Sequence, residues 1–371
     1  MLQFTGYYRW NNTTPAWNNI LTNVQDKTDA AVNSIGAAGD RLYIGLDRRF
    51  DGILFVLGAA GSYTSIIYEY WDGTAWASLP LTLAYTFSGN GGVVRFQIRD
   101  DWATRLLNTV EANDTGLAAG DTAAGIAKYW IRARVTAVST TATINWSIPF
   151  PEYSYTSPTA VRRFAQFPTS FFTSTSIPST QDVIDLIRRV ESQIDKYSWK
   201  SWKPNYNPIT DGESGELYDF SRYGIQLEKY PILHFIDLGI WNGSEFEVMQ
   251  SGRQNDYFID ESNGFIGFTR LMHIPFTYSR SAIYTWGFGE FKRAVRVNYI
   301  WGRDIDFDPH AFLVNRIAAQ LTAVDLIRSH DYSNLVTEGP DKISLVNKVE
   351  MWEREAYQTL DELRGLRIWV P

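Results

Sequence analysis

Short stretches in which apolar and polar residues alternate recur through the first 150 positions of the chain. Strand signals occupy 41–47, 52–57, 65–71, 93–98, 129–137 and 143–148, and the alternation is clearest in the last three of these. An alternation with a period of two puts the apolar side chains on one face of a strand. Turn signals such as Asp72-Gly73 separate the stretches and fit hairpins. We therefore predict that residues 1–150 form an antiparallel β-sandwich, jelly-roll-like, with two sheets packed on their apolar faces.

Residues 151–177 interrupt this pattern and have the composition of a linker. Ser, Thr and Pro fill 15 of the 27 positions from 154 to 180, which is typical of segments without regular structure. Four large aromatic residues lie among them: Phe164, Phe167, Phe171 and Phe172. A solvated linker would not carry four such rings, so we expect this segment to lie against a folded surface.

The last part of the chain changes to helical spacing. Apolar residues recur every three or four positions in 181–198, 309–330 and 341–365, which predicts three amphipathic helices. Either Ser179 or Thr180 can cap the first of them. Strand patterns fill much of 225–302, between the first two helices. We predict that 178–371 form a mainly helical domain with a small β-sheet or hairpin insertion, so that the whole chain is a multidomain α+β protein.

Composition narrows the classes of function. A net charge of −7 argues against a surface that wraps DNA, because phosphate binding needs clustered Lys and Arg. The chain has no cysteine and only four, widely spaced histidines, and no catalytic motif is present. No apolar run approaches the ~20 residues that cross a bilayer, and the start of the chain is unlike a signal peptide. We expect a protein that is not an enzyme, uses no metal or cofactor, does not enter a membrane and is made in the cytoplasm.

Five short patterns occur in a fixed order from residue 178 onward. They are Pro178 to Ile187, Tyr230-Pro231-Ile232, Asp256 to Asp260, Asn263 to Ile266, and Arg293 to Gly302, followed by an Asp-Pro helix start. In this order they resemble the head–tail connector (head-completion adaptor) family of tailed bacteriophages and related archaeal viruses. The resemblance covers about half of the chain, and 270–292 is a long insertion relative to that family. The first half is similar to β-sandwich modules of viral structural proteins, as in Tyr68 to Gly73 and Tyr129 to Val135.

The resemblance implies a virion protein at the neck of the particle, below the portal, made in the host cytoplasm. Copies would form a closed ring of about a dozen, a dodecamer, that joins the capsid to the tail. Packaged DNA would pass through the ring without sequence-specific binding. The implied partners are the portal protein, the tail or neck proteins (stopper and tail terminator) and other copies of the chain.

Two apolar segments are the candidate contact sites. The tail segment, 366–371, is too apolar for free solvation, and in this family such a tail can bind the portal; its candidate residues are Leu366, Arg367, Ile368 and Trp369. The tail could equally fold back on its own domain. The second segment is a loop with candidate contacts to the tail or to neighbouring copies: Phe276, Tyr278, Tyr284, Trp286 and Phe288. An ordinary hairpin whose aromatic side chains pack on the sheet would explain this loop as well.

A different class of function also fits the first half of the chain. Four tryptophans of the predicted sandwich could stack on sugars: Trp71, Trp76, Trp102 and Trp130. The protein would then be a carbohydrate- or capsid-binding protein, such as a tail fibre, an adhesin or a decoration protein. A cluster of exposed tryptophans would favour this alternative, which gives no role to the second half of the chain.

Overall fold

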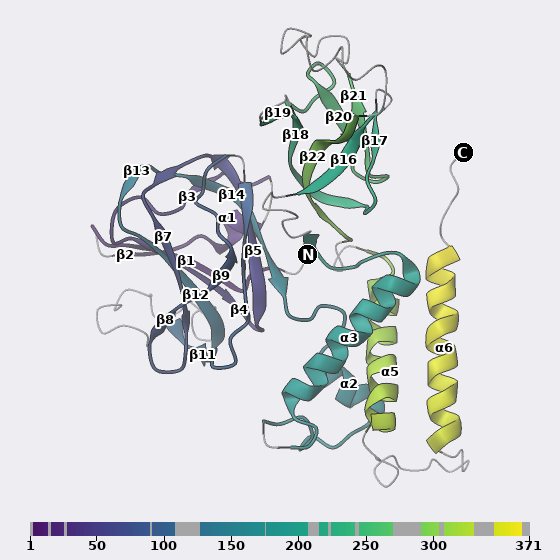
Figure 1. Cartoon of the computed structure of the whole chain (residues 1–371). Coiled ribbons are helices and arrows are strands. Elements are labelled where there is room, and N and C mark those ends of the chain that lie inside the picture. The colour runs from purple at the N-terminus through teal and green to yellow at the C-terminus, as the bar shows by residue number, and fades with distance from the viewer. Residues whose placement is uncertain are drawn as a thin grey trace. The chain divides into compact units, whose positions relative to one another are not determined.

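The computed structural model divides the chain into two compact units, Met1–Tyr153 (unit 1) and Ser154–Pro371 (unit 2) (Figure 1). The residues that it describes are 3–13, 16–25, 28–89, 91–107, 127–174, 176–206, 215–221, 224–241, 245–269, 291–303, 308–329 and 345–365. Of these, 39% are in strands and 25% in helices.

Unit 1 is built from antiparallel sheets. One sheet has the order β2-β1-β4-β12-β7-β8, with β11 paired to β12, and the other has the order β3-β14-β5-β10-β9. The elements are β1 (Gly6–Asn11), β2 (Ala16–Asn19), α1 (Leu21–Gln25), β3 (Val32–Asn33), β4 (Arg41–Leu46), β5 (Phe50–Ala59), β6 (Ser62–Tyr63), β7 (Ile66–Trp71), β8 (Trp76–Ser78), β9 (Leu81–Leu83), β10 (Gly91–Phe96), β11 (Thr104–Arg105), β12 (Lys128–Val135), β13 (Val138–Thr140) and β14 (Thr143–Pro151). Strands β6 and β13 form a separate pair.

The core of unit 1 lies between the two large sheets. Ile44 and Ile131 from one sheet and Phe55 and Val94 from the other belong to one buried cluster. The alternation in the sequence causes this arrangement, because every second side chain of a strand points to the same face. Apolar residues on the opposite face of the first sheet, among them Tyr43 and Trp130, form a second buried cluster.

Unit 2 contains a β part between its helices. A five-stranded sheet has the order β15-β22-β18-β19, with β16 paired to β22, and a three-stranded sheet has the order β17-β21-β20. The strands are β15 (Asn205–Tyr206), β16 (Glu216–Phe220), β17 (Ile225–Gln226), β18 (Ile232–Trp241), β19 (Phe246–Val248), β20 (Tyr257–Asp260), β21 (Phe265–Phe268) and β22 (Phe291–Trp301). Residues of both sheets share one buried core, which includes Leu238, Ile266 and Val297.

The prediction of a mainly helical second domain with a small β insertion is wrong. Five antiparallel sheets make strand the main structure of the described residues, and the β part of unit 2 has two of these sheets and its own core. The sequence pattern understated this part because its longest strand pairing, β18 with β22, shifts register between Ile232 and His234 and again between Phe235 and Asp237. Each shift breaks the alternation that identifies a strand.

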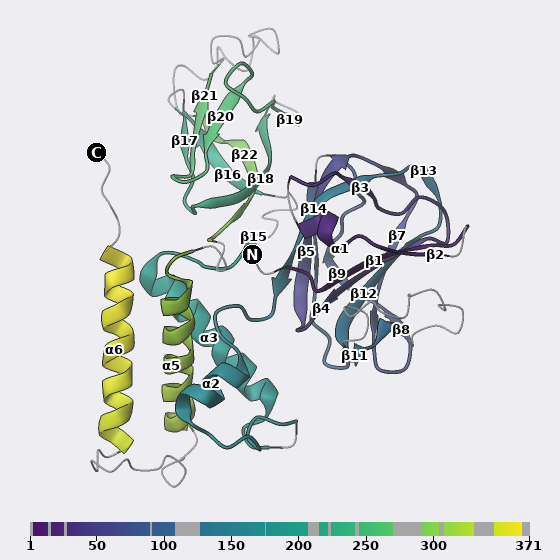
Figure 2. The same cartoon turned by 180° about the vertical axis from the view of Figure 1, so that it is seen from behind.

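Helix α5 lies at the centre of the helical part of unit 2. The helices are α2 (Pro158–Ala165), α3 (Thr180–Ser198), α5 (Ala311–Ser329) and α6 (Leu345–Gly365). Helices α2, α3 and α6 all contact α5, and both views show α5 between α3 and α6 (Figures 1 and 2). Eleven of its side chains are buried, from Val314 to Ile327. No helix among the described residues is long and apolar enough to cross a membrane.

The segment expected to be a linker contains helix α2 and is packed on unit 2. Ser157 caps α2 by accepting a hydrogen bond from the backbone N–H of Ala160. The ring of Phe164 lies 4.9 Å from that of Trp352 in α6, and Phe167 and Phe172 are buried. The aromatic residues of this segment therefore have packing partners, which explains their presence among Ser, Thr and Pro.

Candidate assembly surface

All of the candidate contact residues chosen from the sequence lie outside the described residues. This holds for the portal-binding candidates, Leu366, Arg367, Ile368 and Trp369. It also holds for the loop candidates, Phe276, Tyr278, Tyr284, Trp286 and Phe288. Both choices stay predictions.

Exposed large apolar side chains are confined to unit 2 within the part of the chain that the structure describes. They are Ile177, Trp199, Tyr230, Trp241, Val248, Phe312, Met351 and Tyr357. Ile177, Trp199 and Phe312 are the most exposed, at 83%, 67% and 76%. Exposed aromatic and aliphatic groups are costly in water and are typical of surfaces that bind another protein. Unit 2 therefore carries the candidate assembly surface.

Trp199 is held in a fixed position although its side chain is in solvent. It ends helix α3 with a left-handed backbone, at φ 57°, where glycine is the usual residue. The chain is buried just before and just after it: Ser198 is buried and donates a hydrogen bond to the carbonyl of Ile194 (2.7 Å), and Ser201 and Trp202, two and three residues later, are almost without exposure. The backbone strain at Trp199 is thus maintained by the packing around it.

The C-terminal end of α3 is joined to the C-terminal end of α6. The Lys200 Nζ donates a hydrogen bond to the carbonyl oxygen of Leu363 (2.7 Å), where a positive charge is favourable because the last carbonyls of a helix are unpaired. The Tyr197 hydroxyl donates to Asp361 (2.7 Å), and the Tyr197 ring lies 5.4 Å from that of Tyr357. Trp199 therefore lies close to the last turn of α6, where the described residues end.

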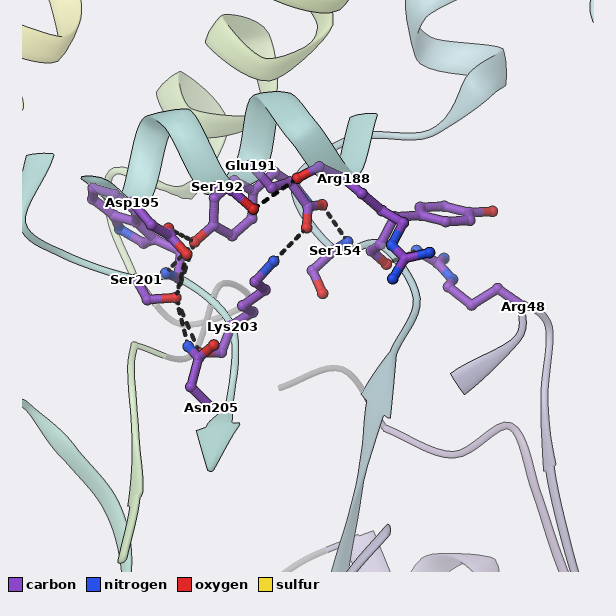
Figure 3. Close-up of polar contacts among 12 residues, drawn as sticks. Arg48, Ser154, Arg188, Glu191, Ser192, Asp195, Ser201, Lys203 and Asn205 are labelled. Atoms are coloured by element: carbon purple, nitrogen blue, oxygen red, sulfur yellow. Dashed lines mark hydrogen bonds and ion pairs between the residues drawn. The ribbon is translucent and has the colours of Figure 1, made fainter. Parts of the chain in front are cut away.

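Two carboxylates of α3 face inward and hold three chain segments together (Figure 3). Glu191 is fully buried. One of its oxygens accepts hydrogen bonds from the backbone N–H groups of Ser154 (2.5 Å) and Tyr155 (2.7 Å). The other lies 2.8 Å from the Lys203 Nζ. Glu191 thus ties the start of unit 2 to the segment that follows α3.

Asp195 lies one helical turn after Glu191 and binds the same segments. It accepts hydrogen bonds from the hydroxyls of Tyr155 and Ser201, the latter at 3.1 Å. The Tyr155 oxygen in turn accepts from the backbone N–H of Trp202 (2.7 Å). Burial raises the pKa of the Asp195 carboxyl to about 6, although Lys203 and the two hydroxyls oppose this shift. Burial, reinforced by Asp195, also raises the pKa of the Tyr155 phenol well above its usual value.

Glu191, Asp195 and their hydrogen-bond and ion-pair partners form a structural network, which we call the clamp. The partners of both carboxylates come from unit 2 itself, and Ser201 is fully buried, so a substrate would have to displace packed residues to reach it. No group of three or more His, Asp or Glu residues that could hold a metal ion occurs among the described residues. The clamp positions α3, and with it Trp199, relative to the start of unit 2.

The tryptophans that suggested sugar binding are largely inside unit 1. Trp130 has no exposure, and Trp71 and Trp102 are at most 7% exposed. Trp76 is half-buried, with the Arg132 guanidinium 4.6 Å from its ring centre. A sugar needs an open ring face to stack on, so these side chains do not form the exposed cluster that would favour a carbohydrate-binding protein.

Sequence reasoning missed both Trp199 and the clamp. Glu191 and Asp195 had the spacing of residues on the solvated side of α3, yet Glu191 is fully buried beside Val190, and Asp195 is partly buried beside Ile194. An available signal was the spacing of four, which places both carboxylates on one helix face. For Trp199, the signal was a large aromatic residue directly after the helix, where glycine or asparagine is expected.

Comparisons with known proteins do not assign a family to the chain. No family model matches it, and no curated protein matches it. Part of the chain is similar to the solved structure of a proposed alpha-L-fucosidase from Bacteroides thetaiotaomicron, with 13% identity and a TM-score of 0.20. The aligned part covers 34% of this chain and 23% of that chain. A likeness this weak carries no argument about fold or function.

Proposed function

We propose that the chain is a structural virion protein, a head–tail connector that forms a ring below the portal and joins the capsid to the tail. The observation that carries this proposal is that, among the described residues, the exposed large apolar side chains lie in unit 2, most of which resembles connectors. A ring subunit needs such groups, because each copy must bury apolar area against two neighbours and against other neck proteins.

The arrangement of unit 2 supports the same proposal. A rigid helical part and a β part with a separate core lie in one chain, and exposed groups occur on both, for example Phe312 on α5 and Trp241 on β18. A subunit with contact groups on two parts can meet a lateral neighbour with one and an axial partner with the other. We propose the portal and the tail or neck proteins as the axial partners, with packaged DNA passing through the ring.

Electron microscopy of particles of the virus that encodes this chain tests the proposal directly. A label on the chain should appear as a ring at the junction of head and tail. Label at fibre tips, or scattered over the capsid, would overturn the connector function and favour the decoration or fibre alternative.

The portal contact has a separate test. Deleting 366–371 should weaken attachment of the purified chain to portal rings by at least tenfold, which corresponds to about 1.4 kcal/mol. The unfolding midpoint of the truncated chain should be unchanged, because the deletion leaves the described cores intact. Replacing Arg253, in the β part, by alanine is the control that should leave attachment unchanged. Normal attachment of the truncated chain would contradict the assignment of the tail segment to the portal.

A further inference from the structure

We propose that the start of unit 2 is a latch that opens while the helices stay folded, and that the charge on Asp195 sets how often it opens. The latch consists of residues 154–156, which are buried and connect the last residue of unit 1 to the segment that contains α2. The latch acts in the same way whether or not the chain is a connector.

The latch is held by a small set of contacts with α3 and with the segment that follows it (Figure 3). Glu191 accepts hydrogen bonds from the backbone N–H groups of Ser154 and Tyr155. The Tyr155 hydroxyl donates to Asp195, and its oxygen accepts from the backbone N–H of Trp202. The rings of Tyr155 and Trp202 lie 6.2 Å apart. Because these contacts all start from one short segment, they can break together.

Three polar atoms in and beside the latch are buried without a hydrogen-bond partner among the described residues: Ser154 Oγ, Thr156 Oγ1 and Trp202 Nε1. Each has left water without gaining a hydrogen bond in return, which destabilises the closed latch. In α5, by contrast, the buried polar side chains of Gln320 and Thr322 both have partners. The latch should therefore open more often than α5 does, as a local event.

The charge balance around the latch depends on Asp195. Lys203 is the cation that acts on this carboxyl, and its ammonium is already paired with the buried Glu191 at 2.8 Å. An ionised Asp195 therefore leaves two carboxylates with one ammonium. Burial, which is the main cause, and the charge of Glu191 raise the pKa of the Asp195 carboxyl in the closed latch to about 6.

The other elements packed around Asp195 face it with uncharged groups. Tyr155 and Ser201 donate hydrogen bonds to it, and the Tyr155 phenol stays neutral because burial raises its pKa well above the usual value. Helices α5 and α6 contribute apolar residues, such as Val314 and Leu363, to the buried cluster that contains Tyr155. Asp195 is thus the group of the latch whose charge changes near pH 6.

Opening should become more frequent as the pH rises. In an open latch, water reaches Asp195 and its pKa returns toward 3.8, so the closed latch binds the proton more tightly. The closed latch is favoured below about pH 4, and this advantage is lost as the pH rises through 6. The opening equilibrium should increase at least tenfold between pH 4 and pH 7, with a ceiling on the order of a hundredfold. Each opening adds roughly 10 Å of extended chain to the connection between the units.

Hydrogen exchange of the full chain in low concentrations of urea tests whether the latch opens locally. The backbone N–H groups of Tyr155 and Trp202 are bonded across the latch, and that of Leu321 lies in the middle of α5. We expect the first two to exchange faster than Leu321 and to depend little on urea, whereas Leu321 should show the full dependence of global unfolding. Equal rates with equal urea dependence would overturn the latch.

Matched variants test the role of Asp195. Asp195→Asn keeps the shape of the side chain but cannot ionise, so protection of the Tyr155 N–H, corrected for the intrinsic rate, should no longer fall between pH 4 and pH 7. Asp185→Asn, an exposed change on the same helix, should retain the fall of the wild type. A wild type without this fall, or an Asp195→Asn variant that keeps it, would overturn the role of Asp195.

Thr156→Val tests the effect of the unpaired groups. Valine has nearly the shape of threonine without the hydroxyl, so the closed latch loses one buried polar atom that has no partner. Exchange of the Tyr155 N–H should slow by roughly threefold or more, with the same pH dependence. Unchanged or faster exchange would show that this hydroxyl does not destabilise the closed latch, and would overturn the argument for its low local stability.

Discussion

Asp195 is a partly buried acid whose pKa is higher in the folded chain than in the unfolded chain. Its folded pKa is about 6, against an ordinary value of 3.8, because burial disfavours the charged form. The folded state therefore binds the proton more tightly between these two values. The stability that this group contributes is fully present below about pH 4 and is lost as the pH rises through 6.

Replacing Asp195 by asparagine should remove this pH dependence. The free energy of unfolding of the wild-type chain, relative to Asp195→Asn, should fall by on the order of 3 kcal/mol between pH 4 and pH 7. Urea unfolding at a series of pH values measures it. Asp185→Asn, an exposed change on the same helix, is the control and should show no comparable slope. A constant difference between the wild type and Asp195→Asn would show that Asp195 titrates normally.

The left-handed backbone at Trp199 gives a second residue-scale prediction. Both Trp199→Gly and Trp199→Ala remove the ring, but only glycine adopts φ 57° without steric cost. The glycine variant should be more stable than the alanine variant by about 1 kcal/mol. The urea midpoints of the two variants give this difference, and equal midpoints would mean that the local backbone relaxes when the ring is removed.

At the scale of elements, α3 is the helix that the sequence predicted best. The Ser179 side chain accepts a hydrogen bond from the backbone N–H of Asp182, and the Asp182 carboxylate accepts one from the backbone N–H of Ser179 (2.8 Å). Ser179→Ala should therefore cost about 1 kcal/mol of stability, as measured by thermal unfolding. Ser192→Ala, in the exposed middle of α3, should cost much less, and equal losses would argue against a role of the cap.

Helix α5 shows that the sequence can reveal the apolar stripe of a helix without revealing which other sides of that helix are also buried. The stripe that includes Ile317, Leu321 and Val324 was visible in the sequence, and these residues are buried. No pattern in the sequence indicates that Ala318 and Ala323, on other sides of α5, are also fully buried. Alanine is common on exposed helices, so only the positions of α2, α3 and α6 around α5 reveal that these alanines are contact points.

Overpacking of α5 tests this close contact. Ala323→Leu adds carbon atoms where neighbouring helices leave no space, and it should destabilise the chain by about 1–3 kcal/mol. Asn315→Leu, at an exposed position of the same helix, should change the stability by less than about 0.5 kcal/mol. Similar effects of the two substitutions in urea unfolding would show that the helices separate easily at α5.

On the scale of the whole molecule, the strands of unit 1 were the most predictable part of the fold. Alternation identified β4, β10, β12 and β14 because each contributes alternating apolar side chains to the core between the sheets, although Tyr43 of β4 and Trp130 of β12 are also buried on the opposite face. The assembly surface was far less predictable, since Trp199 and Phe312 look like core residues in the sequence and become exposed only through the packing of their neighbours. Exposure depends on the three-dimensional arrangement, which no local pattern contains.

The core of unit 1 leads to a prediction about the division of the chain. Residues 1–153 enclose their own buried cluster between two sheets, so this fragment should fold alone. Circular dichroism should show a cooperative thermal transition and a β spectrum for the isolated fragment. A fragment without a cooperative transition would mean that unit 1 needs unit 2 to fold.

The central position of α5 has a consequence for synthesis of the protein. Domains fold as units while the ribosome adds roughly 5 to 20 residues per second. Unit 1 is complete early, but α5 emerges before α6, which covers one of its sides. For a few seconds each nascent chain therefore presents an uncovered apolar helix to the cell. Translation products that stop between Ser329 and Leu345 should be captured by chaperones or aggregate, whereas products that stop before α5 should stay dispersed.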